Sequence, residues 1–123
     1  MTLIDTSAWV EYLRKNDTET ADRVEQLVLL GEAAWCEIVL VELWNGATFN
    51  QQARLRKVEP LVSLLSITAD TWTFSVELAK KARASGVTVP TADLVIASCA
   101  YLYGVDVEHH ADPHFDKLSN LLN

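Results

Sequence analysis

The sequence lacks the features of a secreted, disulfide-bonded or membrane-spanning protein. Its 123 residues include only two cysteines, Cys36 and Cys99, which lie in apolar segments without CxxC spacing. Isolated cysteines of this kind are typical of small buried side chains in a reducing compartment. No apolar run approaches the length of a bilayer span, and no charged-then-apolar leader precedes the first strand. We therefore expect a cytoplasmic protein.

Positive charge is also scarce. Ten Lys and Arg residues stand against 17 Asp and Glu residues, which leaves a formal net charge of −7. This balance argues against non-specific nucleic-acid binding, which depends on Lys and Arg neutralising phosphates. It remains compatible with a nucleic-acid enzyme whose acids bind metal ions, because a bound cation reverses the local potential.

Several motifs of common enzyme classes are missing. The chain contains no GxSxG, no Walker A loop and no GxGxxG, so a nucleophilic serine and a nucleotide-binding loop have no support. Three histidines, His109, His110 and His114, surround Asp112. No HxxxH pair on a helix and no CxxC accompanies them, so surface or packing roles are favoured over zinc ligation.

The hydrophobic pattern predicts one α/β domain over residues 1–123. Half of the residues are apolar, enough to bury a core without disulfides. Short apolar segments predict strands at residues 3–5, 33–36, 64–68 and 105–107. Helical spacing predicts helices at residues 8–14, 19–30, 38–47, 51–65 with a break at Pro60, 70–85, 91–103 with Thr91 as its cap, and a short helix from Pro113. This alternation favours a three-layer α/β/α sandwich with a short, mostly parallel sheet.

Four carboxylates have positions that suggest chemistry. Asp5 and Asp112 each follow a predicted strand, and Asp93 lies in the first turn of a helix. Each also has a structural explanation, since acids cap helices, complement the helix dipole and precede proline in turns. Glu42 lies inside an apolar helical segment, where it either faces solvent or is buried with a partner.

Their joint placement favours a metal site. The carboxyl ends of parallel strands meet at one edge of a sheet, so acids that follow different strands gather there. Gathered carboxylates raise one another's pKa unless a cation is present, and hard oxygen ligands select Mg²⁺ or Mn²⁺. Such a cluster activates water and stabilises a phosphodiester during its hydrolysis.

Four segments together resemble a PIN domain, and more narrowly the VapC-type toxin ribonuclease of a type II toxin–antitoxin system. They are LIDTSAW at residues 3–9, VEL at 41–43 followed by Gly46, TADLVIA at 91–97, and DPHF at 112–115. Their order and spacing agree with that family over essentially the whole chain. The resemblance implies a PIN-like fold and endoribonuclease activity.

The resemblance also implies a site and partners. The acids that would coordinate one or two Mg²⁺ or Mn²⁺ ions, and activate a water for RNA cleavage, are Asp5, Glu42, Asp93 and Asp112. Thr6 and Ser7 would support the first of these. Family members usually form homodimers and are silenced by a cognate VapB-like antitoxin that reaches into the acidic pocket, often with an arginine.

Two positions depart from the family pattern. His110 stands where a hydroxyl residue is common, and His114 stands where an acid or amide is common. These departures concern the fourth acid, Asp112, for which Asp116 is a possible substitute, and they affect a second metal ion before the first.

The sequence also offers candidate RNA-binding residues and two alternatives to the ribonuclease function. Six cations are candidates for gripping RNA phosphates: Arg54, Arg56, Lys57, Lys80, Lys81 and Arg83. One alternative is a catalytically weak PIN fold kept as an interaction module. The other is a receiver-type phosphoacceptor domain, which would have a similar architecture. The sequence leaves the RNA target and the antitoxin open.

Overall fold

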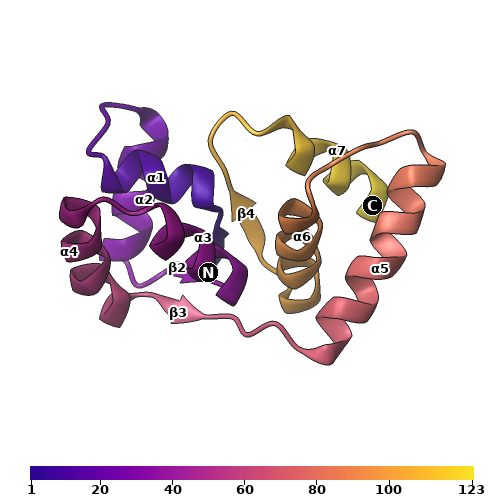
Figure 1. Ribbon diagram of the computed structural model, residues 1–123, viewed down its shortest axis with the longest axis horizontal. Helices are drawn as coiled ribbons and strands as arrows, with labels where there is room; N and C mark the ends of the chain where they lie inside the picture. Colours follow the sequence, from indigo (N-terminus) through magenta and orange to yellow (C-terminus); the bar gives the residue numbers. More distant parts are fainter.

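The computed structural model describes residues 1–123 as a four-stranded parallel sheet flanked by helices (Figure 1). The strand order is β3-β2-β1-β4, with every neighbouring pair parallel. The strands are β1 (Thr2–Ile4), β2 (Ala33–Trp35), β3 (Ser63–Leu64) and β4 (Asp106–Glu108). The predicted α/β fold with a short parallel sheet is confirmed.

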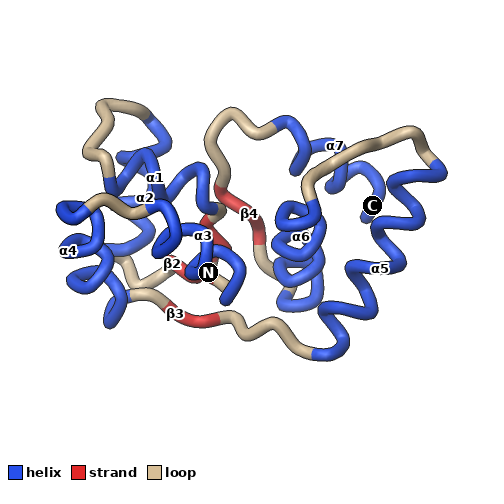
Figure 2. The backbone as a smooth tube through the Cα atoms, viewed as in Figure 1, coloured by secondary structure: helices blue, strands red, loops and turns tan.

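The helices lie on both sides of the sheet. Figures 1 and 2 show α1, α2 and α4 on one side and α5, α6 and α7 on the other. Their bounds are α1 Thr6–Leu13, α2 Glu19–Leu29, α3 Glu37–Gly46, α4 Phe49–Val58, the short 3-10 helix η1 Glu59–Leu61, α5 Ala69–Ala84, α6 Thr91–Tyr103 and α7 Pro113–Leu122. None of these helices combines the length and the apolar character needed to cross a membrane.

Several predicted bounds were wrong, including the start of the helix predicted at 8–14, which begins at Thr6. The helix predicted at 51–65 begins earlier, at Phe49, because Thr48 forms a capping box with Gln51, and it ends at Val58. Pro60 lies in the 3-10 turn that follows, and the third strand covers only Ser63–Leu64. Thr91 is not the cap of α6, since the backbone enters the helix at Pro90 and Thr91 is already helical.

The core fixes the central strand and the first helix. Leu3 and Ile4 are fully buried because β1 lies between β2 and β4, which explains an apolar run without alternation. Trp9 of α1 is also fully buried, with its ring centroid 5.1 Å from that of Trp35 on β2. This aromatic contact holds α1 against the sheet, so the start of α1 has little freedom. The two cysteines are buried free thiols, as predicted.

Three of the predicted acids, Asp5, Glu42 and Asp112, follow junctions at the carboxyl ends of strands. Asp5 follows β1 directly, and its amide donates to the carbonyl of Glu108 at the end of β4 (2.8 Å). Helix α3 follows β2 after a single residue, and the loop after β4 leads to Asp112. Because the strands are parallel, these junctions leave the sheet at the same edge.

Candidate functional site

Asp5 is a buried helix cap at the carboxyl end of β1. It is only 3% exposed, and its Oδ2 accepts hydrogen bonds from the amide (3.1 Å) and the hydroxyl (2.6 Å) of Ser7. Burial raises the pKa of Asp5, the bonds from Ser7 and the Thr6 amide oppose that rise, and the negative charge of Asp112 adds to it. The cap therefore holds a carboxylate at the edge of the sheet, close to a second acid.

Glu42 reaches the same edge from helix α3. Its side chain is exposed, and its Oε1 accepts a hydrogen bond from the Thr6 hydroxyl (2.8 Å). The support predicted for the first aspartate is thus divided between two neighbouring residues. Ser7 binds Asp5 through its hydroxyl, whereas the hydroxyl of Thr6 binds Glu42. Of the two alternatives for Glu42, the structure shows exposure to solvent, and it adds a hydrogen bond from Thr6.

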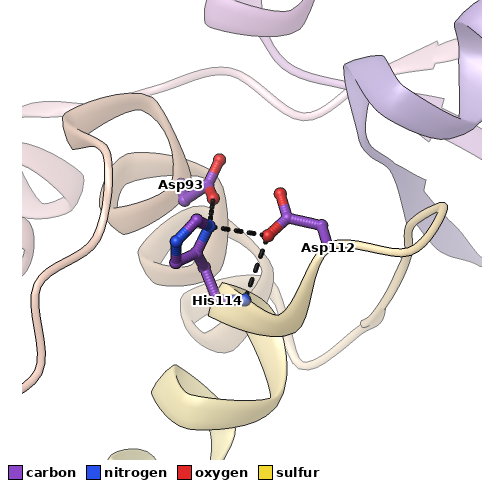
Figure 3. Close-up of side chains that lie close together, drawn as sticks. All are labelled: Asp93, Asp112 and His114. Atoms are coloured by element: carbon purple, nitrogen blue, oxygen red, sulfur yellow. Dashed lines mark hydrogen bonds and ion pairs between the residues drawn. The ribbon is translucent and has the colours of Figure 1, made fainter.

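Asp93, Asp112 and His114 form a compact group (Figure 3). Nδ1 of His114 lies 2.8 Å from Oδ1 of Asp112 and 3.3 Å from Oδ2 of Asp93. Asp112 caps helix α7 by accepting the His114 amide at 3.0 Å. One ligand atom from each of the three residues lies within 4.8 Å of the other two.

The electrostatics of this group favour a bound cation. Asp93 is 8% exposed, and its Oδ2 is buried without a hydrogen bond. Burial is the main cause that raises the pKa of Asp93 to about 7, followed by the adjoining Asp112 carboxyl and the charge of Asp5, whereas His114 opposes the rise. Because three carboxylates repel one another here, the residues fit a hard divalent cation that would relieve the repulsion.

Comparison with known proteins identifies the family. Residues 2–121 match the PIN domain family. The chain belongs to that family. It is 35% identical over 128 residues to Ribonuclease VapC11 of Mycobacterium tuberculosis strain H37Rv and to VapC ribonuclease Mb1587 of Mycobacterium bovis. These alignments cover 100% of this chain and 95% of each relative, so the predicted resemblance is confirmed and the receiver-type alternative is excluded.

Solved structures agree on the fold. VapBC2 from Rickettsia felis, bound to a DNA fragment from its promoter, gives a TM-score of 0.80 at 21% identity and covers 97% of this chain and 93% of that chain. FitAcB from Neisseria gonorrhoeae gives 0.80 at 21% identity, with 98% and 94% covered. DNA-bound VapBC from Salmonella typhimurium gives 0.67 at 20% identity, with 85% and 83% covered. At these identities the likeness shows a shared PIN fold.

Contacts of His110 hold the loop between β4 and α7 of this PIN domain against helices α1 and α2. Its Nδ1 lies 2.8 Å from the Thr20 hydroxyl, its Nε2 lies 3.4 Å from Glu11, and its amide donates to the Ser7 hydroxyl at 3.0 Å. Ser7 therefore connects the first aspartate to the loop that carries the fourth. His109 stacks on Phe115 with ring centroids 5.3 Å apart. Hydrogen-bonding and packing roles account for these two histidines, as predicted.

His114 is the site residue that the sequence reasoning passed over. The sequence favours a surface or packing role for His114 and marks it as a departure from the family pattern, yet its imidazole lies against two of the four acids. The sequence signal for this contact is that His114 lies in the first turn of a helix capped by Asp112, which places the two side chains close together.

Asp116 lies outside the group of acids. Its side chain is 82% exposed and is 3.8 Å from Nε2 of His109. Together these two residues line a cavity of about 450 Å³ beside β4, to which none of the four acids contributes.

The six candidate RNA-binding cations do not form one surface. Helices α4 and α5, which carry them, lie at opposite ends of the molecule (Figure 1). Arg54 donates to the carbonyl of Leu13, and Lys81 donates to the carbonyl of Leu121. Lys80 pairs with the exposed Glu77 at 3.1 Å. The remaining three, Arg56, Lys57 and Arg83, make no ion pair within the chain and stay candidates for RNA contacts.

Proposed function

We propose that this PIN domain is an endoribonuclease that depends on Mg²⁺ or Mn²⁺ and acts as the toxin of a toxin–antitoxin pair. The observation that carries the proposal is the buried, unbonded oxygen of Asp93 beside two further acids. RNA as the substrate class is supported by the relatives over the whole chain, which are named ribonucleases.

We assign the roles of the acids as follows. Asp5, Glu42 and Asp93 would hold the main ion, and Asp112 would bind a second ion or orient the attacking water. A divalent cation in such a site lowers the pKa of water and stabilises the charge on a phosphodiester. Ser7 and Thr6 keep two of the carboxylates in place by direct hydrogen bonds, so little side-chain freedom is lost when a ligand binds.

Exposed apolar side chains support the proposal that this protein binds partner proteins. Val41 and Trp44 of α3, the helix that carries Glu42, are 68% and 37% exposed, and Phe49 at the start of α4 is 81% exposed, which favours these helices as the surface for a VapB-like antitoxin that reaches the acids. A second exposed set lies on α5 and α6 and favours a homodimer interface: Trp72, Val76, Tyr101, Leu102 and Tyr103. Two solved structures of the same fold are named VapBC2 and VapBC, which supports the proposal of a VapB-like antitoxin as a partner. We further propose that residues 1–123 act as one domain in the cytoplasm.

Cleavage of RNA by the purified chain tests the activity. The Asp5→Asn variant keeps the shape of the side chain and should abolish cleavage in Mg²⁺ or Mn²⁺, while circular dichroism shows an intact fold. Asp17→Asn, at an exposed acid in a turn, is the matched control and should cleave like the unmodified protein. Undiminished cleavage by Asp5→Asn overturns the mechanism. RNA or protein binding without any cleavage by the unmodified chain supports the interaction module instead.

Growth of cells that express the chain tests the toxin role. We expect growth arrest that depends on Asp5 and that is relieved when the small DNA-binding protein encoded by an adjacent reading frame is expressed too. Arrest that persists in the Asp5→Asn variant contradicts the role.

A further inference from the structure

We propose that His114 binds the divalent cation directly through Nδ1, so that the metal centre has mixed nitrogen and oxygen ligands. This inference rests on the metal-dependent function proposed above. It adds a ligand to the acids and predicts which metals the site prefers.

The first support is the spacing of the ligand atoms. Adjacent ligands of an octahedral ion with bonds of about 2.1 Å lie about 3 Å apart. Nδ1 of His114 is 2.8 Å from an oxygen of Asp112 and 3.3 Å from an oxygen of Asp93, on either side of that value. All three atoms lie within 4.8 Å of one another. Nδ1 therefore stands where a neighbouring ligand of the same ion would stand.

The second support is that hydrogen bonding leaves one of these contacts unexplained. The approach to Asp112 is an ordinary hydrogen-bond distance. The approach to Asp93 is different, because Oδ2 of Asp93 is buried and makes no hydrogen bond, and its one contact with a basic group is this 3.3 Å approach of Nδ1. A buried oxygen without a partner is costly. A cation shared by Asp93 and His114 satisfies that oxygen, whereas a role limited to orienting Asp112 does not.

The third support is that the backbone presents the imidazole in a fixed place (Figure 3). Pro113 begins helix α7, and the His114 amide is bound by the carboxylate of Asp112. The ring is 34% exposed at the side-chain level, so the site is open to a solvated ion. No other hydrogen bond holds the ring away from the acids.

An imidazole ligand changes the choice of metal. Carboxylate and water ligands suit Mg²⁺, Ca²⁺ and Mn²⁺, whereas imidazole suits later transition metals. With His114 included, the site should bind Co²⁺ more tightly than Mg²⁺. Without it, the preference for Co²⁺ over Mg²⁺ should shrink.

Pulsed electron paramagnetic resonance of bound Mn²⁺ tests the proposal without any assay of cleavage. The unmodified full chain should show a nitrogen coupling that changes from the ¹⁴N to the ¹⁵N pattern when the histidines are labelled with ¹⁵N. The coupling should disappear in His114→Gln and persist in His109→Gln, the control in the loop that precedes α7. Calorimetry should show that His114→Gln weakens Co²⁺ binding by about tenfold or more, and Mg²⁺ binding less.

The outcomes separate this inference from the proposed function. Glutamine keeps a hydrogen-bond donor for Asp112 but offers no imidazole nitrogen, so an unchanged Co²⁺ affinity in His114→Gln, or bound Mn²⁺ without histidine coupling, overturns the ligand role alone. Absence of any Mn²⁺ binding by the unmodified chain, or binding that Asp93→Asn leaves unchanged, overturns the metal-dependent function itself. Absence of the histidine coupling in the labelled, unmodified chain overturns the ligand role without any variant, so the inference stays falsifiable even if His114→Gln fails to fold.

Discussion

Removing the charge of Asp93 should stabilise the metal-free protein. The substitution is Asp93→Asn, which keeps the size of a side chain that is 8% exposed in the first turn of α6. In the folded protein burial and two neighbouring acids raise the pKa of Asp93 to about 7, from an ordinary 3.8. The carboxylate therefore favours the unfolded chain, where it is ionised freely in water.

The pH dependence has a definite sign. Below pH 3.8 Asp93 is protonated in both states, so burial of its charge costs nothing. Between pH 3.8 and about 7 the unfolded chain releases this proton while the folded protein retains it, so the free energy of unfolding falls as the pH rises. Above about pH 7 both states are ionised and the full penalty applies.

The magnitude follows from the same values. A difference of about three pKa units corresponds to about 4 kcal/mol, at 1.36 kcal/mol per unit, as an upper limit. The titration belongs to the pair Asp93 and Asp112, and the variant also loses a favourable interaction with the helix dipole and the attraction of His114. We expect Asp93→Asn to raise the free energy of unfolding by about 1–2 kcal/mol at about pH 8.

Urea denaturation with a chelator present measures the effect at about pH 8 and about pH 5. The gain should fall to less than half at the lower pH, because pH 5 lies about one unit above the unfolded pKa of 3.8 and about two units below the folded pKa of about 7. Mn²⁺ added in place of the chelator should stabilise the unmodified protein but not the variant. Asp70→Asn is the matched control, an exposed acid in the first turn of α5, and should cost about 0.3–1 kcal/mol at both pH values. A variant that is less stable than the unmodified protein at about pH 8, or a gain of equal size at both pH values, would refute the reasoning.

Three further predictions concern stability measured by urea denaturation. Ser7→Ala removes a hydroxyl that bonds both the first aspartate and the β4–α7 loop, and should cost about 1–3 kcal/mol; a cost below about 0.5 kcal/mol would contradict this. Leu118→Ala should cost about 2–5 kcal/mol because Leu118 is fully buried, and clearly more than Leu121→Ala at a partly buried position of the same helix. Gly104→Ala should cost about 1 kcal/mol because of its φ of 69°, whereas Gly46→Ala, with ordinary φ and no neighbour within 4 Å, should be neutral or stabilising; equal effects would be inconsistent with backbone strain.

The elements were predictable because their signals are local. Thr18 caps α2 through its side chain, and Gly31, with a φ of 71°, follows the end of that helix. Pro113 begins α7 directly after the cap Asp112. The largest boundary errors lie around α4. This helix begins with a capping box at Thr48 and carries no buried residue before Leu55, so apolar spacing indicated its start poorly.

The acids of the site were also predictable, but their contacts were not. Strand ends at one sheet edge were sufficient to predict that Asp5 and Asp112 gather, whereas helix α6, which carries Asp93, follows helix α5 with no strand between them. The hydrogen bond from Thr6 to Glu42 joins residues 36 positions apart, and the bond from the amide of His110 to Ser7 joins residues 103 positions apart. No pattern in the sequence specifies which of two adjacent hydroxyls faces which carboxylate.

The sequence by itself determined the parallel α/β architecture, the edge at which the acids meet and the family. The physical reason is that strand periodicity, helix periodicity and helix caps depend on residues close together in the sequence. Only the tertiary structure decided that Ser7 serves the first aspartate and Thr6 serves Glu42. It also decided that His114, set aside as a departure from the family pattern, lies between Asp93 and Asp112. The physical reason is that such contacts depend on differences of about 1 Å, which are set by how the core, including Trp9 against Trp35, seats each helix on the sheet.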